Sequence, residues 1–570
     1  MPQTEEEIFQ EFKSAADQYN EDSYHLKDLW YSDGTIQEIR TAKHQIKIAP
    51  KHPHFHNVVV SFQAALDAFL TLLTDWTLPF THPLNWLYLI FVYPIVLFSF
   101  AIFELSLIII HTVHLDALVK FIDEKWREYL TPGSYHFADN HKLSVNKLFY
   151  KNQANVIVGV DSDFYNQPQN GFIAEDGVDA LDQPYFKEDE EIVEKHPDFN
   201  LDIAQFLLYM SDLVYSRESD KALSAKLNVY RFKKAPEKRD ELIQEIVGLL
   251  RESDDTIRNQ AKKWHLTFTS LTELNSCGDS FAGLFYSEKH NFIVVAFKGP
   301  TSDDFEKWFT DLVFQHEDGR SFIRNEVHKS YRSLLYPENK TGPYATIIDG
   351  IHHAIKNIRH YRDQGTRKHK LINIWVTGHS LGGAMATWFY GRVKKSPSDL
   401  GEHCVLRDAY VFGAPRVGDS DFVLTYKSSL GRHEKNVESA LWRVVDDNDL
   451  LAHLPPGYRY PKNVGKYNIL TNYSVGEAVK FYQDGRKPKL LKNPILEPGY
   501  VPVIKSSRPL DGDKYTVPTH EYDKSLPSFI RNHMTSRYAL ALAQARNHLS
   551  ERGGSGTKGF NGEIILEREK

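Results

Sequence analysis

A serine flanked by glycines is the side chain of this sequence best suited to nucleophilic chemistry. The pattern G-x-S-x-G spans residues 378–382 and centres on Ser380. The apolar run 371–377 predicts a buried strand before it, and residues 381–394 predict a helix after it. On such a sharp turn a serine projects its hydroxyl toward the amide groups that begin the helix. We therefore predict a nucleophile at Ser380; the alternative is a tight turn in which the serine only caps the helix.

A serine nucleophile needs a base, and the base needs a carboxylate that orients it. In folds that use this turn, the acid and then the histidine follow the serine along the chain. Carboxylates follow the apolar run 441–445 at Asp446, Asp447 and Asp449. The histidines beyond the run are His453, His520, His533 and His548. Spacing alone does not choose among these four.

Strand and helix patterns alternate around the serine. Residues 283–287 and 292–297 predict a β-hairpin, and residues 344–361 predict a helix. Short apolar runs at 409–412 and 441–445 suit the centre of a sheet. This alternation predicts the α/β class, with a mostly parallel central sheet and helices on both faces.

Four motifs of this sequence resemble those of the class 3 lipase family, the fungal triacylglycerol lipases. They are G-H-S-L-G-G from Gly378, F-G-A-P-R-V-G from Phe412, D-L-L-A-H-L-P-P from Asp449, and F-K-G from Phe297 with Trp308 and Asp311 after it. Ala452 replaces the usual proline of the third motif. The resemblance covers residues 200–548 and implies an α/β-hydrolase fold.

The resemblance also implies roles for particular residues. Ser380 is expected to be the nucleophile, Asp449 to orient the base, and His533 to be the base. The match around Asp449 makes Asp446 and Asp447 weaker alternatives. The family's reaction requires no cofactor and no metal ion.

Two backbone N–H donors are expected to stabilise the oxyanion of the reaction. One is the N–H of Leu381, next to the serine. The family takes the other from a serine or threonine after its F-R-G motif, where this chain has Pro300, which lacks an N–H. We predict Thr301 as the second donor; otherwise the site has lost one.

A lid is predicted shortly after Thr301. Phe305, Trp308, Phe309 and Leu312 stand at helical spacing and form one apolar stripe. In the family such a helix covers the serine in water and turns onto lipid at an interface. The alternative is a helix whose stripe packs on the core.

A long apolar segment lies far from these motifs. Residues 76–103 contain no Asp, Glu, Lys or Arg. Residues 84–110 predict either a membrane-spanning helix or, because Pro94 permits a kink, a hairpin within one leaflet. A buried core helix is the third interpretation. With amphipathic flanks, residues 58–130 form a predicted helical, membrane-associated region.

The remaining chain is predicted to divide into four parts. These are a polar N-terminal segment over 1–57, an acidic linker region over 131–199, the catalytic domain over 200–548, and a flexible tail over 549–570. The net charge of −7 argues against a nucleic-acid partner.

Together these observations predict a membrane-attached serine lipase that hydrolyses triacylglycerol-type esters through an acyl-enzyme. The alternatives are a phospholipase A1 or diacylglycerol lipase with the same triad, or a non-catalytic lipid-binding protein of this fold. The expected partners are an acylglycerol or phospholipid substrate and a membrane or lipid-droplet surface. The expected location is the endoplasmic reticulum or a lipid droplet rather than outside the cell, with the catalytic domain in the cytosol, because basic residues follow the apolar run and cysteines are few.

Overall fold

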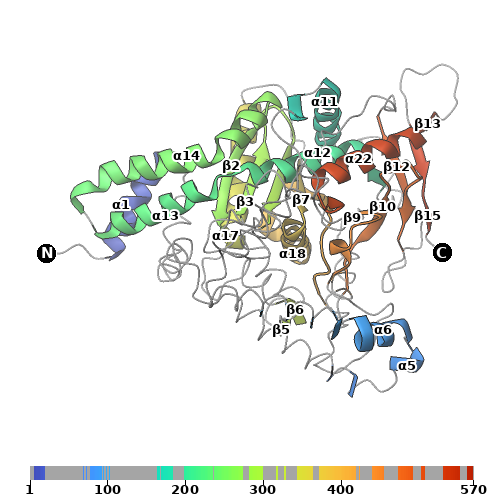
Figure 1. The fold of residues 1–570 in the computed structure, drawn as a ribbon. Helices are drawn as coiled ribbons and strands as arrows, with labels where there is room; N and C mark the ends of the chain where they lie inside the picture. Colours follow the sequence, from blue (N-terminus) through green and yellow to red (C-terminus); the bar gives the residue numbers. More distant parts are fainter. Residues whose placement is uncertain are drawn as a thin grey trace, which may run out of the picture.

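A nine-stranded sheet forms the centre of the structure, which is a computed structural model (Figure 1). The residues described are 5–18, 69, 72–73, 78–81, 83–92, 94–95, 98, 102, 105, 164–166, 168–183, 198–234, 236–273, 281–299, 316–318, 326–328, 343–363, 371–418, 423, 426, 440–454, 473–491, 502–507, 531–551 and 562–568. In spatial order the strands are β15 (Glu567–Arg568), β11 (Lys489–Leu490), β10 (Glu477–Phe481), β9 (Leu441–Asp446), β8 (Cys404–Phe412), β7 (Ile372–His379), β4 (Phe292–Lys298), β3 (Phe281–Tyr286) and β2 (Thr267–Glu273).

The sheet is mixed, with a parallel centre. The strands β4, β7, β8, β9 and β10 run parallel to their neighbours within this group. Antiparallel pairs flank them, β2 with β3 and β3 with β4 on one side and β10 with β11 on the other. The hairpin predicted over 283–297 is the pair β3–β4. The predicted parallel arrangement is therefore confirmed for the centre of the sheet, where the predicted nucleophile lies.

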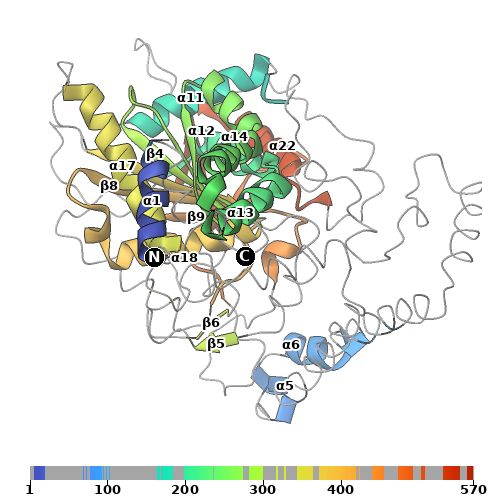
Figure 2. The same cartoon turned by 90° about the vertical axis from the view of Figure 1, so that its left-hand side faces the viewer.

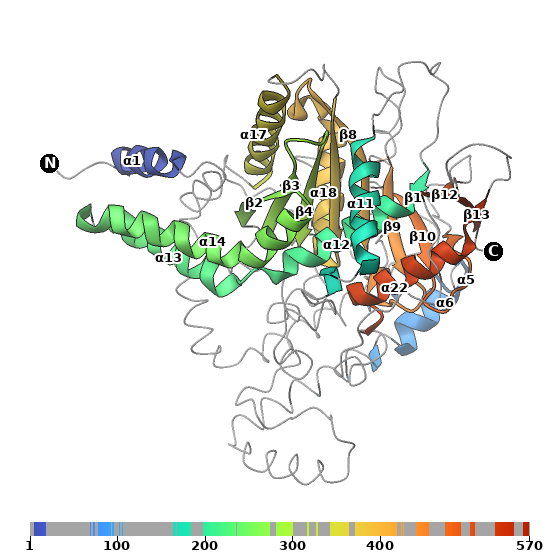
Figure 3. The same ribbon diagram turned by 90° about the horizontal axis from the view of Figure 1, so that it is seen from above.

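One face of the sheet is covered by α17 (Pro343–Asp363) and α18 (Leu381–Lys395), as Figure 3 shows. Ile293, Val295 and Phe297 of β4 are fully buried in the apolar core that these helices share with the sheet. Successive side chains of a strand point to opposite faces, so the residues between them must find a second core.

That second core lies under α11 (Pro168–Asp182), α12 (Leu201–Leu213) and α22 (Thr535–Ala545) on the opposite face. Phe292 and Val294, the alternate residues of β4, are fully buried in it. Because β4 is apolar on both sides, it reads as a continuous apolar run rather than an alternating one. Helices on both faces are thus present, as the sequence predicts.

A buried ion pair fastens α12 to the C-terminal part of the chain. Arg546, at the start of the 3₁₀ helix η9 (Arg546–His548), donates from Nη2 to Asp202 Oδ1 at 2.6 Å. The same guanidinium donates to Gln205 at 2.7 Å and to Ser506 at 2.6 Å. A charge buried this completely requires paired and hydrogen-bonded neighbours. These contacts fix the start of the helix that runs across the second face of the sheet.

A helical hairpin projects from the sheet, and in Figure 2 it points toward the viewer. It consists of α13 (Ser219–Lys234) and α14 (Arg239–Lys263), joined by the 3₁₀ helix η6 (Pro236–Lys238). The N-terminal helix α1 (Glu5–Asp17) packs against it, with the Phe12 ring edge-on to Phe232 at 5.0 Å between centroids. Part of the predicted polar N-terminal segment is therefore folded onto this hairpin.

The smaller elements complete the described chain. A second sheet has the order β1 (Phe199–Asn200), β12 (Val503–Ser506), β14 (Gly562–Ile565) and β13 (Ser550–Glu551), and β5 (His316–Asp318) pairs with β6 (Glu326–His328). The short helices are α5 (Leu78–Thr81), α6 (Pro83–Leu87), the π-helix η3 (Tyr88–Val92), η4 (Phe164–Asn166), η5 (Val214–Ser216), η7 (Pro397–Leu400) and η8 (Leu451–His453).

Two predictions of unstructured chain are wrong where the structure describes those residues. Within the predicted acidic linker, α11 exposes Glu175 and Asp179 but buries Ile173 and Leu181 completely, so the acidic side chains conceal an amphipathic helix. Within the predicted flexible tail, β14 pairs with β12 and β15 pairs with β11. Backbone pairing with distant strands is not visible in local composition.

Among the residues of 84–110 that the structure describes, the predicted transmembrane helix is not found. In the part of this segment that the structure describes, α6 has five residues and η3 has five. A spanning helix needs about 20 consecutive apolar residues. Among all described residues, no helix combines the length and the apolarity required to cross a membrane. Leu89 of η3 is instead fully buried in the core shared with α17 and α18.

Candidate active site

Ser380 occupies the turn between β7 and α18 in a strained backbone conformation. Its φ is 55° and its ψ is −126°, a region that residues other than glycine rarely adopt. Its N–H donates to the Phe412 carbonyl at 2.9 Å, which ties the turn to β8. A Cβ added to Gly382 would lie 2.2 Å from the Phe297 carbonyl oxygen. Glycine is therefore required where the new helix crosses β4, and this is the sharp turn that the G-x-S-x-G pattern predicts.

The structure brings Ser380, His533 and Asp449 into one chain of hydrogen bonds. His533 Nε2 lies 2.8 Å from Ser380 Oγ, and His533 Nδ1 lies 2.8 Å from Asp449 Oδ2. Asp449 is fully buried, and Ser380 and His533 are 6% and 5% exposed. The serine follows β7, the aspartate follows β9, and the histidine precedes α22. The carboxyl ends of parallel strands thus supply two of the three side chains at one edge of the sheet.

The Asp449 carboxylate is held by three further hydrogen bonds. Its Oδ1 accepts from the backbone N–H groups of Leu451 at 2.9 Å and Ala452 at 3.4 Å. Its Oδ2, the atom that faces His533, also accepts from the Tyr538 hydroxyl at 2.5 Å. Burial, followed by the charge of Asp449, raises the pKa of Tyr538, so this hydroxyl keeps its proton. The orientation of the carboxylate toward the imidazole is therefore fixed from both oxygens.

The two alternative carboxylates have other partners. Asp447 forms ion pairs with Lys480 at 3.2 Å and Arg486 at 2.7 Å. Asp446 accepts hydrogen bonds from the Asn448 N–H at 3.1 Å and the Gln483 side chain at 2.9 Å. Neither geometry directs the carboxylate to His533.

The alternative histidines are also placed elsewhere, or lie outside the described residues. His548 Nε2 is 2.6 Å from the Gly485 carbonyl oxygen. His453 belongs to η8, where burial and the nearby Arg416 lower its pKa to about 4. His520 is not among the described residues. Of the histidines that the structure describes after Asp449, His533 is the one within hydrogen-bonding distance of Ser380.

His379, which precedes the serine, is in direct contact with His533. Its Nε2 lies 2.7 Å from the carbonyl oxygen of His533, and the two rings are 4.8 Å apart. Burial, and then the neighbouring His533, lower the pKa of His379 to about 3. The ring is therefore neutral and does not repel a positive charge that forms on His533. The sequence analysis assigned no role to this residue, although it stands inside the serine motif.

Only one of the two predicted oxyanion donors is described. Leu381 begins α18 directly after the serine, so its N–H belongs to the unpaired donors of the helix N-terminus. The other predicted donor and the lid lie outside the described residues; these are Thr301, Phe305, Trp308, Phe309 and Leu312, together with Pro300.

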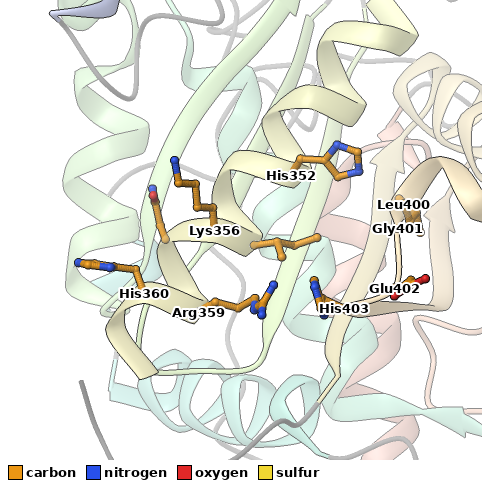
Figure 4. A pocket seen from close by; sticks show the side chains of 10 residues that line it. His352, Lys356, Arg359, His360, Leu400, Gly401, Glu402 and His403 are labelled. Atoms are coloured by element: carbon orange, nitrogen blue, oxygen red, sulfur yellow. The ribbon is translucent and has the colours of Figure 1, made fainter. Parts of the chain in front are cut away.

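A surface pocket with a volume of about 660 Å³ lies away from these residues (Figure 4). It is lined by side chains of α17, among them His352, Lys356 and Arg359, and by residues 400–403 before β8. The start of β8 is the amino-terminal edge of the parallel strands, whereas Ser380 follows the carboxyl end of the eight-residue β7. A strand rises about 3.3 Å per residue, so the pocket and Ser380 are separated by the length of β7.

Asp446 gives the protein a pH-dependent stability that a single substitution should remove. Burial is the main cause that raises its pKa from 3.8 to about 6, with smaller contributions from Asp449 and Asp447. A carboxyl group with a raised pKa stabilises the fold below pH 3.8, and this contribution is lost as the pH rises through 6. Asp446→Asn should therefore be about 2 kcal/mol more stable than the wild type at pH 7, with no difference near pH 4. Urea unfolding at both pH values measures this, and an equal difference at both would contradict it.

Comparisons with known proteins agree with the motifs around Ser380. Residues 294–458 match the family model described as Lipase (class 3). A lipase from Rhizopus niveus is 28% identical over 216 residues, which are 35% of this chain and 45% of that protein. The secreted mono- and diacylglycerol lipase of Malassezia globosa is 27% identical over 174 residues, 30% of this chain and 50% of that protein. The chain thus spans about half the length of these relatives.

Solved structures with partial similarity carry related names. Lipase II from Rhizopus niveus has a TM-score of 0.27 and 20% identity, and covers 40% of this chain and 70% of that one. A triacylglycerol lipase whose catalytic centre is described as a serine protease triad also has a TM-score of 0.27 and 20% identity, over 39% of this chain and 69% of that one.

The predicted location is contradicted by the comparison with known proteins. The relative from Malassezia globosa is named as a secreted lipase, which points away from a cytosolic catalytic domain.

The family resemblance drawn from the motifs is confirmed over one part of the chain. The family match extends from β4 to beyond η8 and includes Ser380 and Asp449, whereas His533 lies after it. It supports the prediction of a carboxylic ester hydrolase. Residues 294–458 are similar to class 3 lipases.

Proposed function

We propose that this protein is a serine lipase that hydrolyses acylglycerol esters through an acyl-enzyme. The observation that carries the proposal is the continuous hydrogen-bond chain from Ser380 through His533 to Asp449, with 2.8 Å at each step. A serine hydroxyl in contact with an oriented imidazole is the arrangement that acyl transfer requires. The same observation argues against a non-catalytic lipid-binding protein.

In the proposed reaction Ser380 Oγ attacks the ester carbonyl carbon, and His533 Nε2 takes the hydroxyl proton. Asp449 holds the Nδ1–H of His533 and stabilises the imidazolium that forms. The Leu381 N–H, and Thr301 as the proposed second donor, stabilise the oxyanion. His533 then protonates the leaving alcohol. In the second half of the reaction His533 takes a proton from water, the water oxygen attacks the acyl carbon, and His533 returns the proton to Ser380 Oγ as the fatty acid leaves.

The class of substrate rests on the family similarity. One relative is named a mono- and diacylglycerol lipase, and the matching family is that of class 3 lipases. We therefore take acylglycerols as the substrate, with triacylglycerol as the first choice. A diacylglycerol lipase or a phospholipase A1 would use the same triad. The comparison of lipids described below decides among these substrates.

We also propose that the protein binds the surface of its insoluble substrate. Between residues 69 and 105, several of the large apolar side chains that the structure describes are exposed. They are Phe69, Leu73, Phe80, Leu87, Phe91, Ile95, Phe98, Ile102 and Leu105. An apolar surface of this kind is typical of binding to other apolar surfaces, here the hydrocarbon of emulsified lipid. The lid helix over Ser380 remains a proposal that rests on the spacing of its apolar residues.

Fatty-acid release from three lipids tests the proposed function. Purified wild type and Ser380→Ala are incubated with emulsified triacylglycerol, dispersed diacylglycerol and phosphatidylcholine vesicles. We expect wild-type release to be fastest from an acylglycerol, and release by the variant to be at background. A fluorophosphonate probe, which labels activated serines, should label the wild type alone.

Two outcomes would overturn parts of the proposal. Faster release from phosphatidylcholine would replace the acylglycerol by a phospholipid and keep the triad. A folded wild type that neither labels with the probe nor releases fatty acid would overturn the hydrolase itself and favour the lipid-binding alternative.

A further inference from the structure

The turn after α12 reaches the active site from outside the family match. Tyr215 lies in η5, which follows α12, and its side chain is only 2% exposed. Its hydroxyl donates to the backbone carbonyl of His379 at 3.2 Å. Its ring also lies edge-on to the His379 ring, with 6.0 Å between centroids. One side of this tyrosine therefore touches the residue directly before the nucleophile.

The other side of the same hydroxyl touches the end of β4. The Tyr215 oxygen lies against Gly299, the residue that follows β4. A Cβ added to Gly299 would lie 2.9 Å from this oxygen, 3.0 Å from the Gly382 nitrogen and 3.3 Å from Leu381 Cβ. Gly299 is thus in close contact with the first turn of α18, which contains the expected oxyanion donor.

The hydroxyl is suited to a fixed bridge. Buried polar groups are costly unless they are hydrogen-bonded, and this hydroxyl donates to the His379 carbonyl. Burial is the main cause that raises the pKa of Tyr215, so the hydroxyl keeps the proton that it gives to His379.

Further buried contacts fix the segment around Tyr215. Asp212, at the end of α12, accepts a hydrogen bond from Thr535 Oγ1 at 2.5 Å, and Thr535 stands two residues after His533. Arg217 pairs with Asp254 at 3.2 Å, and both side chains are essentially unexposed. Buried contacts therefore fix the backbone both before and after Tyr215.

We infer that Tyr215 is a positioning residue for catalysis. Its hydroxyl lies between the nucleophile turn at His379 and Gly299 after β4, and so sets how the first turn of α18, which carries the expected donor Leu381, packs on Gly299. The inference rests on the proposed function. Stabilisation of an oxyanion depends on donors that are already in place, because donors that must move contribute less. The hydroxyl of Tyr215 therefore contributes to the transition state rather than to substrate binding.

Tyr215→Phe keeps the ring and removes the hydroxyl together with its hydrogen bond to His379. We expect kcat for a soluble short-chain p-nitrophenyl ester to fall about 10- to 100-fold, with KM changed less than about twofold. The inhibition constant of a boronic acid, which mimics the tetrahedral intermediate, should rise by the same factor as kcat/KM falls. If Tyr215 had a structural role only, Tyr215→Phe would lower the melting temperature. The ratio of its affinity for the boronic acid to its affinity for the substrate would then be the same as in the wild type.

Tyr410→Phe is the matched control. Tyr410 is fully buried, and its hydroxyl accepts from the Asn200 N–H at 3.1 Å, at the far end of α12. Tyr410→Phe removes a buried tyrosine hydroxyl that contacts the N-terminus of α12 from β8, and we expect its kcat and boronic-acid affinity to stay within about twofold of wild type.

The outcomes separate this inference from the proposed function. A wild type without ester hydrolysis or probe labelling contradicts the proposed function. An active wild type and a folded Tyr215→Phe with unchanged kcat and unchanged boronic-acid affinity contradict the positioning role alone. Equal losses in Tyr215→Phe and Tyr410→Phe would also overturn it, because they would show a general effect of α12.

Discussion

Ser380→Ala, His533→Ala and the double variant are expected to reduce kcat for ester hydrolysis by one and the same factor, about 10⁶. The reason is the single hydrogen bond of 2.8 Å between Ser380 Oγ and His533 Nε2. Without the imidazole the hydroxyl is a poor nucleophile, and without the hydroxyl the imidazole has no proton to take. Each single variant therefore already removes the whole nucleophilic step.

Initial rates on a soluble p-nitrophenyl ester measure this prediction, since they do not depend on an interface. His548→Ala is a suitable control, because its imidazole contacts the Gly485 carbonyl group, and its rate should stay within about twofold of wild type. Melting temperatures exclude unfolding. Losses that multiply in the double variant would show that Ser380 and His533 act separately, and a His533→Ala variant with substantial activity would identify another base.

Local patterns were sufficient for the elements that carry the serine. The run 371–377 is apolar except for Asn373 and Thr377, because β7 is buried on both faces. G-x-S-x-G marks the turn because strand and helix cross too closely for a side chain at Gly382. The sequence therefore predicts β7, the turn and α18 with their correct order and within two residues of their ends.

The partners of the serine depend on contacts that no local pattern encodes. His533 is 153 residues from Ser380 and 84 residues from Asp449, so its choice over three other histidines came from family resemblance. The contact of Tyr215 with His379 joins residues 164 positions apart. From sequence alone Tyr215 is one aromatic residue in an apolar helix, and nothing separates it from the core residues beside it.

Composition misled where acidic or flexible residues surround a folded segment. The exposed Glu175 and Asp179 dominate the composition around α11, but the helix is stabilised by apolar residues on its other side. The strand β14 follows a glycine-rich stretch and forms because β12 supplies a partner for its backbone. Both errors arise from stabilisation by distant parts of the chain.

Asp449→Asn should reduce kcat by about 10⁴ and leave the fold intact. The backbone N–H groups of Leu451 and Ala452 both donate to Oδ1, so the oxygen of the new amide is retained there. Its NH₂ group then replaces Oδ2, the atom that accepts from His533 Nδ1 and from the Tyr538 hydroxyl. An amide donor at this position favours the imidazole tautomer with its proton on Nε2, which cannot take the proton of Ser380.

The same substitution at Asp447 supplies the control, because this carboxylate is paired with Lys480 and Arg486 rather than with the imidazole. Asp447→Asn should keep kcat within about threefold of wild type, since such ion pairs contribute little. The Asp449→Asn loss should shrink as the pH rises, because hydroxide partly replaces the missing general base. If instead Asp447→Asn loses activity and Asp449→Asn retains it, the residue that orients the base has been assigned wrongly, and the hydrogen bond between Asp449 and His533 serves stability alone.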